Sequence, residues 1–160
     1  MEYQVRDINR TLSFTGTLLA ESSSRTVGKP RWTDLRLYRT DNGTYILEKV
    51  GASRLMHMPG CRKSMGDLPR FQDLYPGQDP DDPEFAYDDC VPDPYDFTTL
   101  RIEQDRHWAQ ITERPEAIVK AVMRYKGGVT KMPYTSAVLL AKAAEVDDGI
   151  AEVYDEAWID

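Results

Sequence analysis

Two runs of alternating apolar and polar residues, joined by a tight-turn signal, constrain the fold of this chain more than any other feature. The run RWTDLRLYRT (31–40) and the run TYILEKV (44–50) flank Asp41-Asn42-Gly43, and Asn-Gly accepts the backbone angles of a short hairpin turn at low cost. The earlier run TLSFTGTLLAE (11–21) alternates in the same way. We therefore predict an antiparallel β-meander over residues 11–57.

The last part of the chain predicts helices. Pro115 favours the start of a helix that runs to the stop signal at Gly127-Gly128, and a second helix is predicted over about 134–146. Asp148 can cap a short last helix whose apolar side includes Trp158. Since strands come first and helices last, without alternation, we predict an α+β fold with two or three C-terminal helices packed on the sheet.

A stretch rich in Pro, Gly and Asp separates these two parts. Within it, the run DPDDPEFAYDDCVPDPYDF (79–97) carries eight carboxylates and no basic residue. We expect residues 79–96 to form an irregular surface segment, its carboxylates solvated or paired with Arg and Lys. Burying an aromatic contributes about 1.5–3 kcal/mol, whereas an exposed ion pair contributes about 0–1 kcal/mol. The anchors of the segment should therefore be its aromatic residues, Phe85, Tyr87 and Tyr95.

The resulting organisation is one domain over residues 1–160. Its predicted parts are a β-meander (11–57), a long Pro- and Asp-rich loop (58–96), a strand or hairpin (97–112) and the helices (113–160).

The net charge of −7 divides unevenly along the chain. Residues 71–100 contain nine acids and no base, and residues 145–160 contain seven acids and no base. The rest of the chain therefore has 20 bases against 11 acids. Either this pattern only favours solubility, or the acidic segments lie over a basic body, within the reach of screened charges.

The histidines and cysteines of the chain are four in number: His57, Cys61, Cys90 and His107. Together they could form a Cys₂His₂ zinc site that staples the long loop, which has little apolar content of its own. The alternative is that they are unliganded thiols and imidazoles. Two cysteines are too few for a disulfide scaffold in a chain of this size.

A calcium site in the acidic run would use the oxygens of Asp79, Asp81, Asp82 and Glu84. The run lacks the glycine of a calcium loop and is full of proline, so we expect a solvated loop instead.

Signals for catalysis are weak. The chain has no G-x-S-x-G, Walker or G-x-G-x-x-G motif. A nucleophilic pair, Cys90 with His107 or Cys61 with His57, needs a proximity that composition does not show. Glu103, Asp105 and His107 alternate along a predicted strand, so they could share one face for metal or acid–base chemistry, or form a plain polar face. We predict a protein that is not an enzyme and has no cofactor other than the zinc considered above.

Aromatic and basic residues interleave on the outward face of the predicted hairpin. A protein partner, a single-stranded nucleic acid or the chain's own helices could cover such a face. The residues are Trp32, Arg36, Tyr38, Tyr45 and Lys49.

One predicted strand and the predicted hairpin resemble the central part of the EXLDI family of small bacterial proteins. The family's F-x-G-x-L-L-A strand is matched over residues 14–20, and its L-Y-R-T-x-x-G-x-Y hairpin over residues 37–45. The ending LLAKAAEVDDGIAEVYDEAWID is also similar, although it closes on EAWID rather than on the family's Glu-x-Leu-Asp-Ile. The resemblance implies an accessory bacterial protein and no particular chemistry. The matching residues are Phe14, Gly16, Leu18, Leu19, Ala20, Leu37, Tyr38, Arg39, Thr40, Gly43 and Tyr45.

These features together predict a small, non-enzymatic accessory or regulatory protein that acts through protein–protein contacts. No stretch approaches the roughly 20 apolar residues of a membrane span, and the N-terminus has no secretory apolar region, so we expect a cytoplasmic protein without a membrane partner. One alternative is a module that binds single-stranded nucleic acid on its basic-aromatic sheet face and is screened by the acidic segments. Another is an inhibitor whose acidic run mimics nucleic-acid phosphates.

Overall fold

The computed structural model describes residues 1–62 and 67–154. The chain divides into two compact units. The host unit comprises Met1–Ser24, Thr33–Val50 and His107–Asp160, and the inserted unit comprises Arg25–Trp32 and Gly51–Arg106. The division follows from packing, because the inserted segment buries an apolar core of its own.

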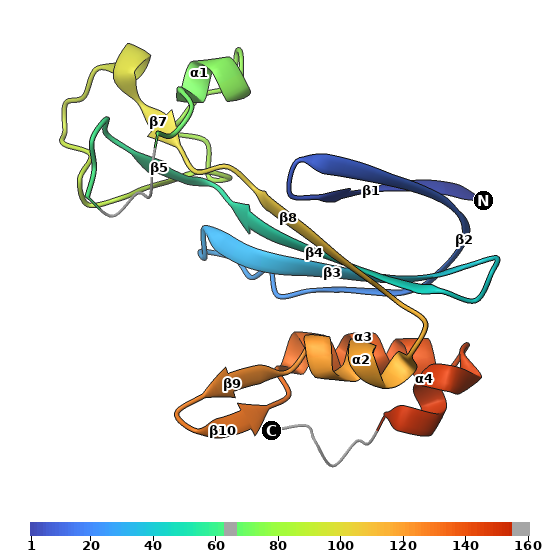
Figure 1. The fold of residues 1–160 in the computed structure, drawn as a ribbon. Coiled ribbons are helices and arrows are strands. Elements are labelled where there is room, and N and C mark those ends of the chain that lie inside the picture. Colours follow the sequence, from blue (N-terminus) through green and yellow to red (C-terminus); the bar gives the residue numbers. More distant parts are fainter. Residues whose placement is uncertain (63–66, 155–160) are drawn as a thin grey trace. The chain divides into compact units, whose positions relative to one another are not determined.

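A five-stranded sheet forms the centre of the host unit, and its strand order is β1-β2-β3-β4-β8 (Figure 1). The pairs β1–β2 and β2–β3 are antiparallel, which confirms the predicted antiparallel sheet and α+β class. The meander begins earlier than predicted, because β1 precedes residue 11. The strands are β1 (Glu2–Asp7), β2 (Arg10–Ser23), β3 (Arg31–Thr40), β4 (Tyr45–Ser53) and β8 (Arg106–Thr112).

Strand β2 changes its packing partners halfway along. Its register against β3 shifts between Leu18 and Ala20, and a bulge of this kind bends a strand and re-aims its side chains. Leu18 thus packs in one apolar cluster and Ala20 in another. The close approach of β3 requires a glycine at position 16, where an added Cβ would lie 2.3 Å from the carbonyl oxygen of Arg39.

Three helices cover one face of this sheet (Figure 1): α2 (Pro115–Ala121), α3 (Tyr134–Ala144) and α4 (Asp148–Val153). Helix α3 packs against β2, and α4 packs against both α2 and α3. The core between sheet and helices includes Leu37, Leu47, Ile118, Leu140 and Ile150, each with 0% exposure.

Asp147, and not the predicted Asp148, caps helix α4. Its carboxylate accepts hydrogen bonds from the Ile150 amide (3.0 Å), the Tyr45 hydroxyl (2.6 Å) and the Arg39 guanidinium (2.7 Å). Burial alone would raise the pKa of Asp147, but these donors outweigh burial and hold the pKa below its usual value. The cap thus also links the helix layer to strands β3 and β4 by hydrogen bonds.

The predicted helix that runs to Gly127 is wrong in its second half. Helix α2 ends at Ala121, and the chain continues into a hairpin of β9 (Arg124–Lys126) and β10 (Val129–Lys131). Gly127 and Gly128 have φ angles of 61° and 79°, as a two-residue hairpin turn requires. The glycine pair therefore turns a β-ribbon instead of ending a helix.

The inserted unit contains a three-stranded sheet of order β6-β5-β7, formed by β5 (Leu55–His57), β6 (Ala86–Tyr87) and β7 (Arg101–Ile102). Two short helices accompany it, α1 (Phe71–Leu74) and the 3₁₀ helix η1 (Phe97–Thr99). The strand or hairpin predicted over residues 97–112 is instead divided, since β7 pairs with β5 and β8 belongs to the host sheet.

The aromatic residues of the acidic run differ in their burial. Phe85 is 7% exposed, and its ring meets that of Phe71 edge to face at 4.9 Å in the core of the inserted unit. Tyr95 packs against the same core, and the more exposed Tyr87 contacts Tyr95 at 5.4 Å between ring centroids. The run is therefore held within its own unit, where the loop residues and β5–β7 supply the core.

In the part of the chain that the structure describes, no helix is both long enough and apolar enough to cross a membrane.

Candidate metal centre

Four side chains of the inserted unit bring potential metal ligands together. His57, Cys61, Asp88 and Cys90 each offer one ligand atom, and these atoms all lie within 4.8 Å of one another. His57 ends β5, Cys61 follows a turn closed by its own amide and the Met58 carbonyl, and Asp88 follows β6. The parallel pairing of β5 with β6 joins Leu55 to Ala86 and Met56 to Tyr87, and the hydrogen bond from the Asp88 amide to the Met56 carbonyl (2.9 Å) continues it.

The spacing of the ligand atoms fits a tetrahedral ion. The His57 Nδ1 atom lies 3.6 Å from an Asp88 carboxylate oxygen and 3.9 Å from the Cys90 sulfur. The Cys61 sulfur lies 3.9 Å from the same Asp88 oxygen. Zinc bonds of about 2.0–2.3 Å at tetrahedral angles place ligand atoms about 3.3–3.8 Å apart. The three separations above are close to these values, and since no pair is more than 4.8 Å apart, shortening separations by up to about 1 Å would bring the four atoms to bonding distance of one ion.

The imidazole of His57 is oriented by Glu103. The side chain of His57 is fully buried, and its Nε2 atom lies 2.7 Å from a Glu103 carboxylate oxygen. An ionised carboxylate accepts the Nε2 proton, which leaves the lone pair on Nδ1, the atom that faces Asp88 and Cys90. Such a carboxylate–histidine pair is the usual support of a metal-bound histidine.

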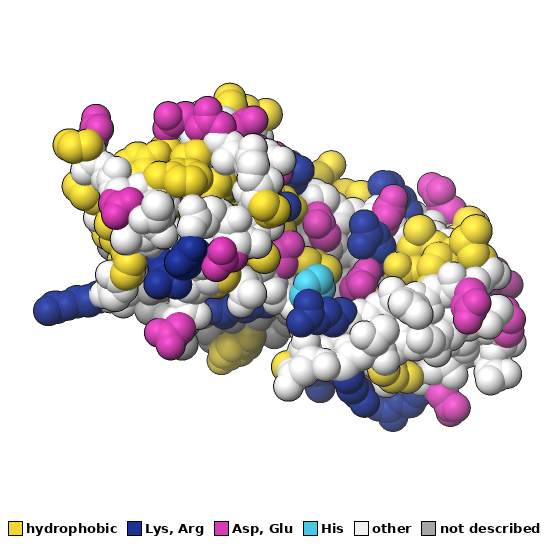
Figure 2. Space-filling view, turned by 90° about the horizontal axis from the view of Figure 1, so that it is seen from above, with side chains coloured by type: hydrophobic (Ala, Val, Ile, Leu, Met, Phe, Trp, Pro, Cys, Tyr) yellow, Lys and Arg dark blue, Asp and Glu magenta, His cyan; other side chains and the backbone are white. Residues whose placement is uncertain are grey.

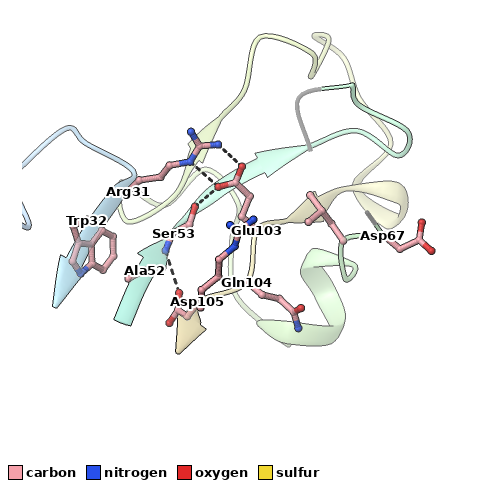
Figure 3. Close-up of a pocket in the computed structure, with 11 residues that line it drawn as sticks. Arg31, Trp32, Ala52, Ser53, Asp67, Glu103, Gln104 and Asp105 are labelled. Atoms are coloured by element: carbon pink, nitrogen blue, oxygen red, sulfur yellow. Dashed lines mark hydrogen bonds and ion pairs between the residues drawn. The ribbon is translucent and has the colours of Figure 1, made fainter. Parts of the chain in front are cut away.

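Glu103 is itself held by two further donors (Figure 3). Arg31 binds both carboxylate oxygens through its guanidinium, and the Ser53 hydroxyl donates to one of them at 2.7 Å. Burial alone would raise the pKa of Glu103, but hydrogen bonds from Arg31, Ser53 and His57 lower it to about 2. These contacts fill the acceptor sites of the carboxylate and keep it charged, which favours an orienting role over acid–base catalysis.

The environment of Cys90 does not favour nucleophilic catalysis without a metal. Burial raises the pKa of its thiol to about 11, so the metal-free group is protonated at neutral pH. The Met58 amide donates to the sulfur at 3.3 Å, a contact that stabilises a thiolate once an ion displaces the proton. A metal ligand is therefore a better description of Cys90 than a nucleophile.

Three of the four predicted zinc ligands are brought together, and the fourth is replaced. His107 is not a member of the cluster; it lies on β8 in the host unit, and Asp88 supplies the fourth ligand atom. The predicted polar strand face of Glu103, Asp105 and His107 is also wrong. Glu103 and Asp105 precede β8, where Asp105 accepts from the Ser53 amide (3.1 Å).

The carboxylates considered for calcium serve local contacts. Asp79 and Asp82 accept backbone amides two residues ahead, Asp81 accepts from the Tyr87 hydroxyl, and Glu84 pairs with Arg54. All four side chains are exposed. They do not form a ligand cluster in residues 1–62 and 67–154.

The predicted aromatic-basic surface is largely buried. Tyr45 is 1% exposed beneath the helix layer, and Tyr38 is 5% exposed against the rings of Tyr3 and Phe14 on the other side of the sheet. Trp32, 9% exposed, carries the guanidinium groups of Arg25 and Arg54 over its ring.

The two cations of that predicted surface, Arg36 and Lys49, differ in their contacts. Arg36 pairs with Glu21 and Glu48, while Lys49 is exposed on β4. Figure 2 shows acidic and basic side chains interspersed over the face in view, and not gathered by sign.

Sequence reasoning missed Asp88 as a ligand, although the spacing Asp88-x-Cys90 carried a signal. An Asp side chain often accepts the backbone amide two residues ahead in a turn, as Asp88 does from Cys90 (3.1 Å), so a ligand-type residue at this spacing was a candidate. The support of Glu103 by Arg31 and Ser53 had no such local signal.

Comparison of the chain with protein-family models, curated proteins and solved structures finds no match.

Proposed function

We propose that the protein binds one zinc ion through His57, Cys61, Asp88 and Cys90, and that this ion has a structural role. The observation that supports it best is the set of four ligand atoms from two distant segments, with His57 held by a charged carboxylate. Two sulfurs with one nitrogen and one oxygen suit zinc, because hard cations such as Mg²⁺ and Ca²⁺ prefer oxygen alone.

A structural role follows from the number of ligands. Catalytic zinc sites keep one coordination position open for water or substrate, whereas four protein ligands close the site. The small core of the inserted unit, with Met56, Phe71 and Phe85 among its members, gains from an ion that joins residues 57–61 to residues 88–90. The ion is expected to stabilise the inserted unit against local unfolding.

The broader proposal is a non-enzymatic accessory protein that presents this unit to a protein partner. Seven of the eight carboxylates in residues 79–97 are exposed, which supports a partner with a basic surface. The nucleic-acid alternative gains no support from the sheet face, because Trp32, Tyr38 and Tyr45 are buried. Phosphate mimicry by the acidic run, a cytoplasmic location and the EXLDI resemblance stay predictions from the sequence.

Metal analysis of the purified protein tests the zinc site. One zinc per chain is expected by elemental analysis, and substitution by Co²⁺ should give a thiolate-to-cobalt charge-transfer band and the intense visible bands of tetrahedral coordination. Cys61→Ser and Asp88→Asn should lose most of the zinc. Glu103→Gln should weaken the affinity by about 10–100-fold while the cobalt spectrum keeps its shape.

The matched control is Asp89→Asn, which changes an exposed carboxylate one residue from the proposed ligand. It should retain full zinc content. The proposal is wrong if the wild type binds neither zinc nor cobalt, or if Asp89→Asn loses as much metal as Asp88→Asn. Capture on a basic protein surface by the wild type, lost when Asp79, Asp81 and Asp82 become Asn, would support the partner proposal, and equal capture by both would refute it.

A further inference from the structure

A cavity in the host unit is distinct from the metal centre. Its volume is about 370 Å³, and it opens where the helix layer meets β3 and β4. Its apolar wall comprises Leu35, Leu47, Val122 and Met123, and its polar lining includes Lys49, Arg124 and Ser136. A volume of this size falls within the usual range of about 300–1,000 Å³ for small-molecule sites.

The start of helix α3 forms part of the cavity lining, through Pro133, Thr135 and Ser136. This helix has 11 residues, its N-cap Pro133 makes no side-chain capping bond, and its first turn holds no acidic residue. The first amides of a helix have no acceptor within the helix, and they carry a partial positive charge. The start of α3 thus offers uncompensated donors to the cavity.

A second, independent observation concerns Ser136. This side chain lines the cavity and is only 5% exposed, yet its hydroxyl has no hydrogen-bond partner among residues 1–62 and 67–154. A hydroxyl that reaches a cavity and has no partner in the protein is free to donate to a group bound there. A bound group with acceptor oxygens would supply the missing partner.

The charges around the cavity have one sign. Lys49 and Arg124 both line it, no carboxylate does, and neither cation has an ion pair within the described part of the chain. From residue 117 to residue 144 the sequence contains five bases and no acid. The cavity therefore combines two cations, helix amides and a hydroxyl, all of which favour an oxyanion.

We propose that this cavity binds the phosphate group of a small organic phosphate. The phosphate lies against the start of α3, Lys49 and Arg124 neutralise its charge, and the Ser136 hydroxyl donates to one of its oxygens. The apolar wall of Leu35, Leu47, Val122 and Met123 contacts the organic part. The wall distinguishes an organic phosphate from inorganic phosphate, which would make only the polar contacts.

Titration of the zinc-loaded protein with phenyl phosphate at constant ionic strength tests this site, by isothermal calorimetry and ³¹P nuclear magnetic resonance. One equivalent should bind, more tightly than inorganic phosphate, while phenol should not bind measurably. Lys49→Gln and Arg124→Gln should each weaken binding by about tenfold or more, since each removes a charge-assisted contact. Ser136→Ala should weaken it by about fivefold to tenfold.

The control is Lys120→Gln, which removes an exposed cation on α2 outside the cavity. It should leave the affinity within twofold of the wild type. Absence of phenyl phosphate binding by the wild type overturns the proposal, and so does an equal loss in Lys120→Gln, which would indicate general charge attraction. Lys49 and Arg124 are exposed, so both variants should fold even if Ser136→Ala does not.

Discussion

Replacing Asp147 by alanine should destabilise the host unit far more than replacing the adjacent Asp148. The Asp147 side chain is 3% exposed and accepts hydrogen bonds from three donors. Loss of the cap to Ile150 costs about 1 kcal/mol, and leaving the buried Tyr45 hydroxyl unpaired costs about 1–3 kcal/mol. The pair with Arg39 adds at most about 1 kcal/mol, because that side chain is 41% exposed and solvent screens it.

We therefore expect the free energy of unfolding to fall by about 2–5 kcal/mol in Asp147→Ala, and by no more than about 0.5 kcal/mol in Asp148→Ala. In urea melts followed by far-ultraviolet circular dichroism, a slope near 2 kcal/mol per molar translates this loss into a midpoint lower by about 1–2.5 M. In the double variant Tyr45→Phe with Asp147→Ala, the loss of unfolding free energy should be smaller than the sum of the two single losses. The Tyr45→Phe change removes the hydroxyl that Asp147→Ala alone would leave buried and unpaired.

Equal destabilisation by Asp148→Ala and Asp147→Ala would refute the assignment of Asp147 as the capping residue, since Asp148 would then share that role. Exact additivity of the Tyr45→Phe and Asp147→Ala losses would also contradict it, because the two side chains are in direct contact.

Two further predictions concern acid and the acidic run. Because the pKa of Asp147 is lowered in the folded state, its contribution to stability is complete well above the unfolded value of about 3.9 and is lost as the pH falls through the lower folded value. The stability difference between the wild type and Asp147→Asn should therefore shrink from pH 7 to pH 2 in urea melts, and a constant difference would argue against the lowered pKa. In zinc-saturated protein, Phe85→Ala should expose the acidic run to limited proteolysis, because this 7%-exposed ring fills the small core, whereas the exposed Asp81→Asn should leave the cleavage rate within about twofold. Faster cleavage in Asp81→Asn than in Phe85→Ala would show that charge, and not apolar packing, holds the run.

Local signals in the sequence were sufficient for much of the host unit. The turn signal at Asn42-Gly43 lies between β3 and β4 as predicted, and α3 occupies most of the predicted range 134–146. The same kind of signal misled at Gly127-Gly128, because a glycine pair can end a helix or turn a hairpin. The choice depends on the residues that flank it, Tyr125 and Val129, which favour strands.

The candidate metal centre could be predicted only in part, because its membership depends on long-range pairing. Residue type alone identified His57, Cys61 and Cys90. The choice of Asp88 over His107 depends on the parallel pairing of β5 with β6 and on the separate position of β8, neither of which has a periodic signal in the sequence. Trp32, Tyr38 and Tyr45 were expected outside for a related reason. Alternation assigns residues to the two faces of a sheet, but it does not tell which faces are covered.

The segment that connects β4 to β8 leaves the host sheet and returns to it at neighbouring positions. Strand β4 leads out of the host unit and β8 leads back, and these two strands are neighbours in the sheet. Neighbouring strands lie only about 5 Å apart, so the long excursion between them spans a gap that a short turn could also close. The length of the excursion can thus change without a change of register in the host sheet. Because the excursion and Arg25–Trp32 form one compact unit with an apolar core of its own, we expect this unit to have its own rate of amide hydrogen exchange.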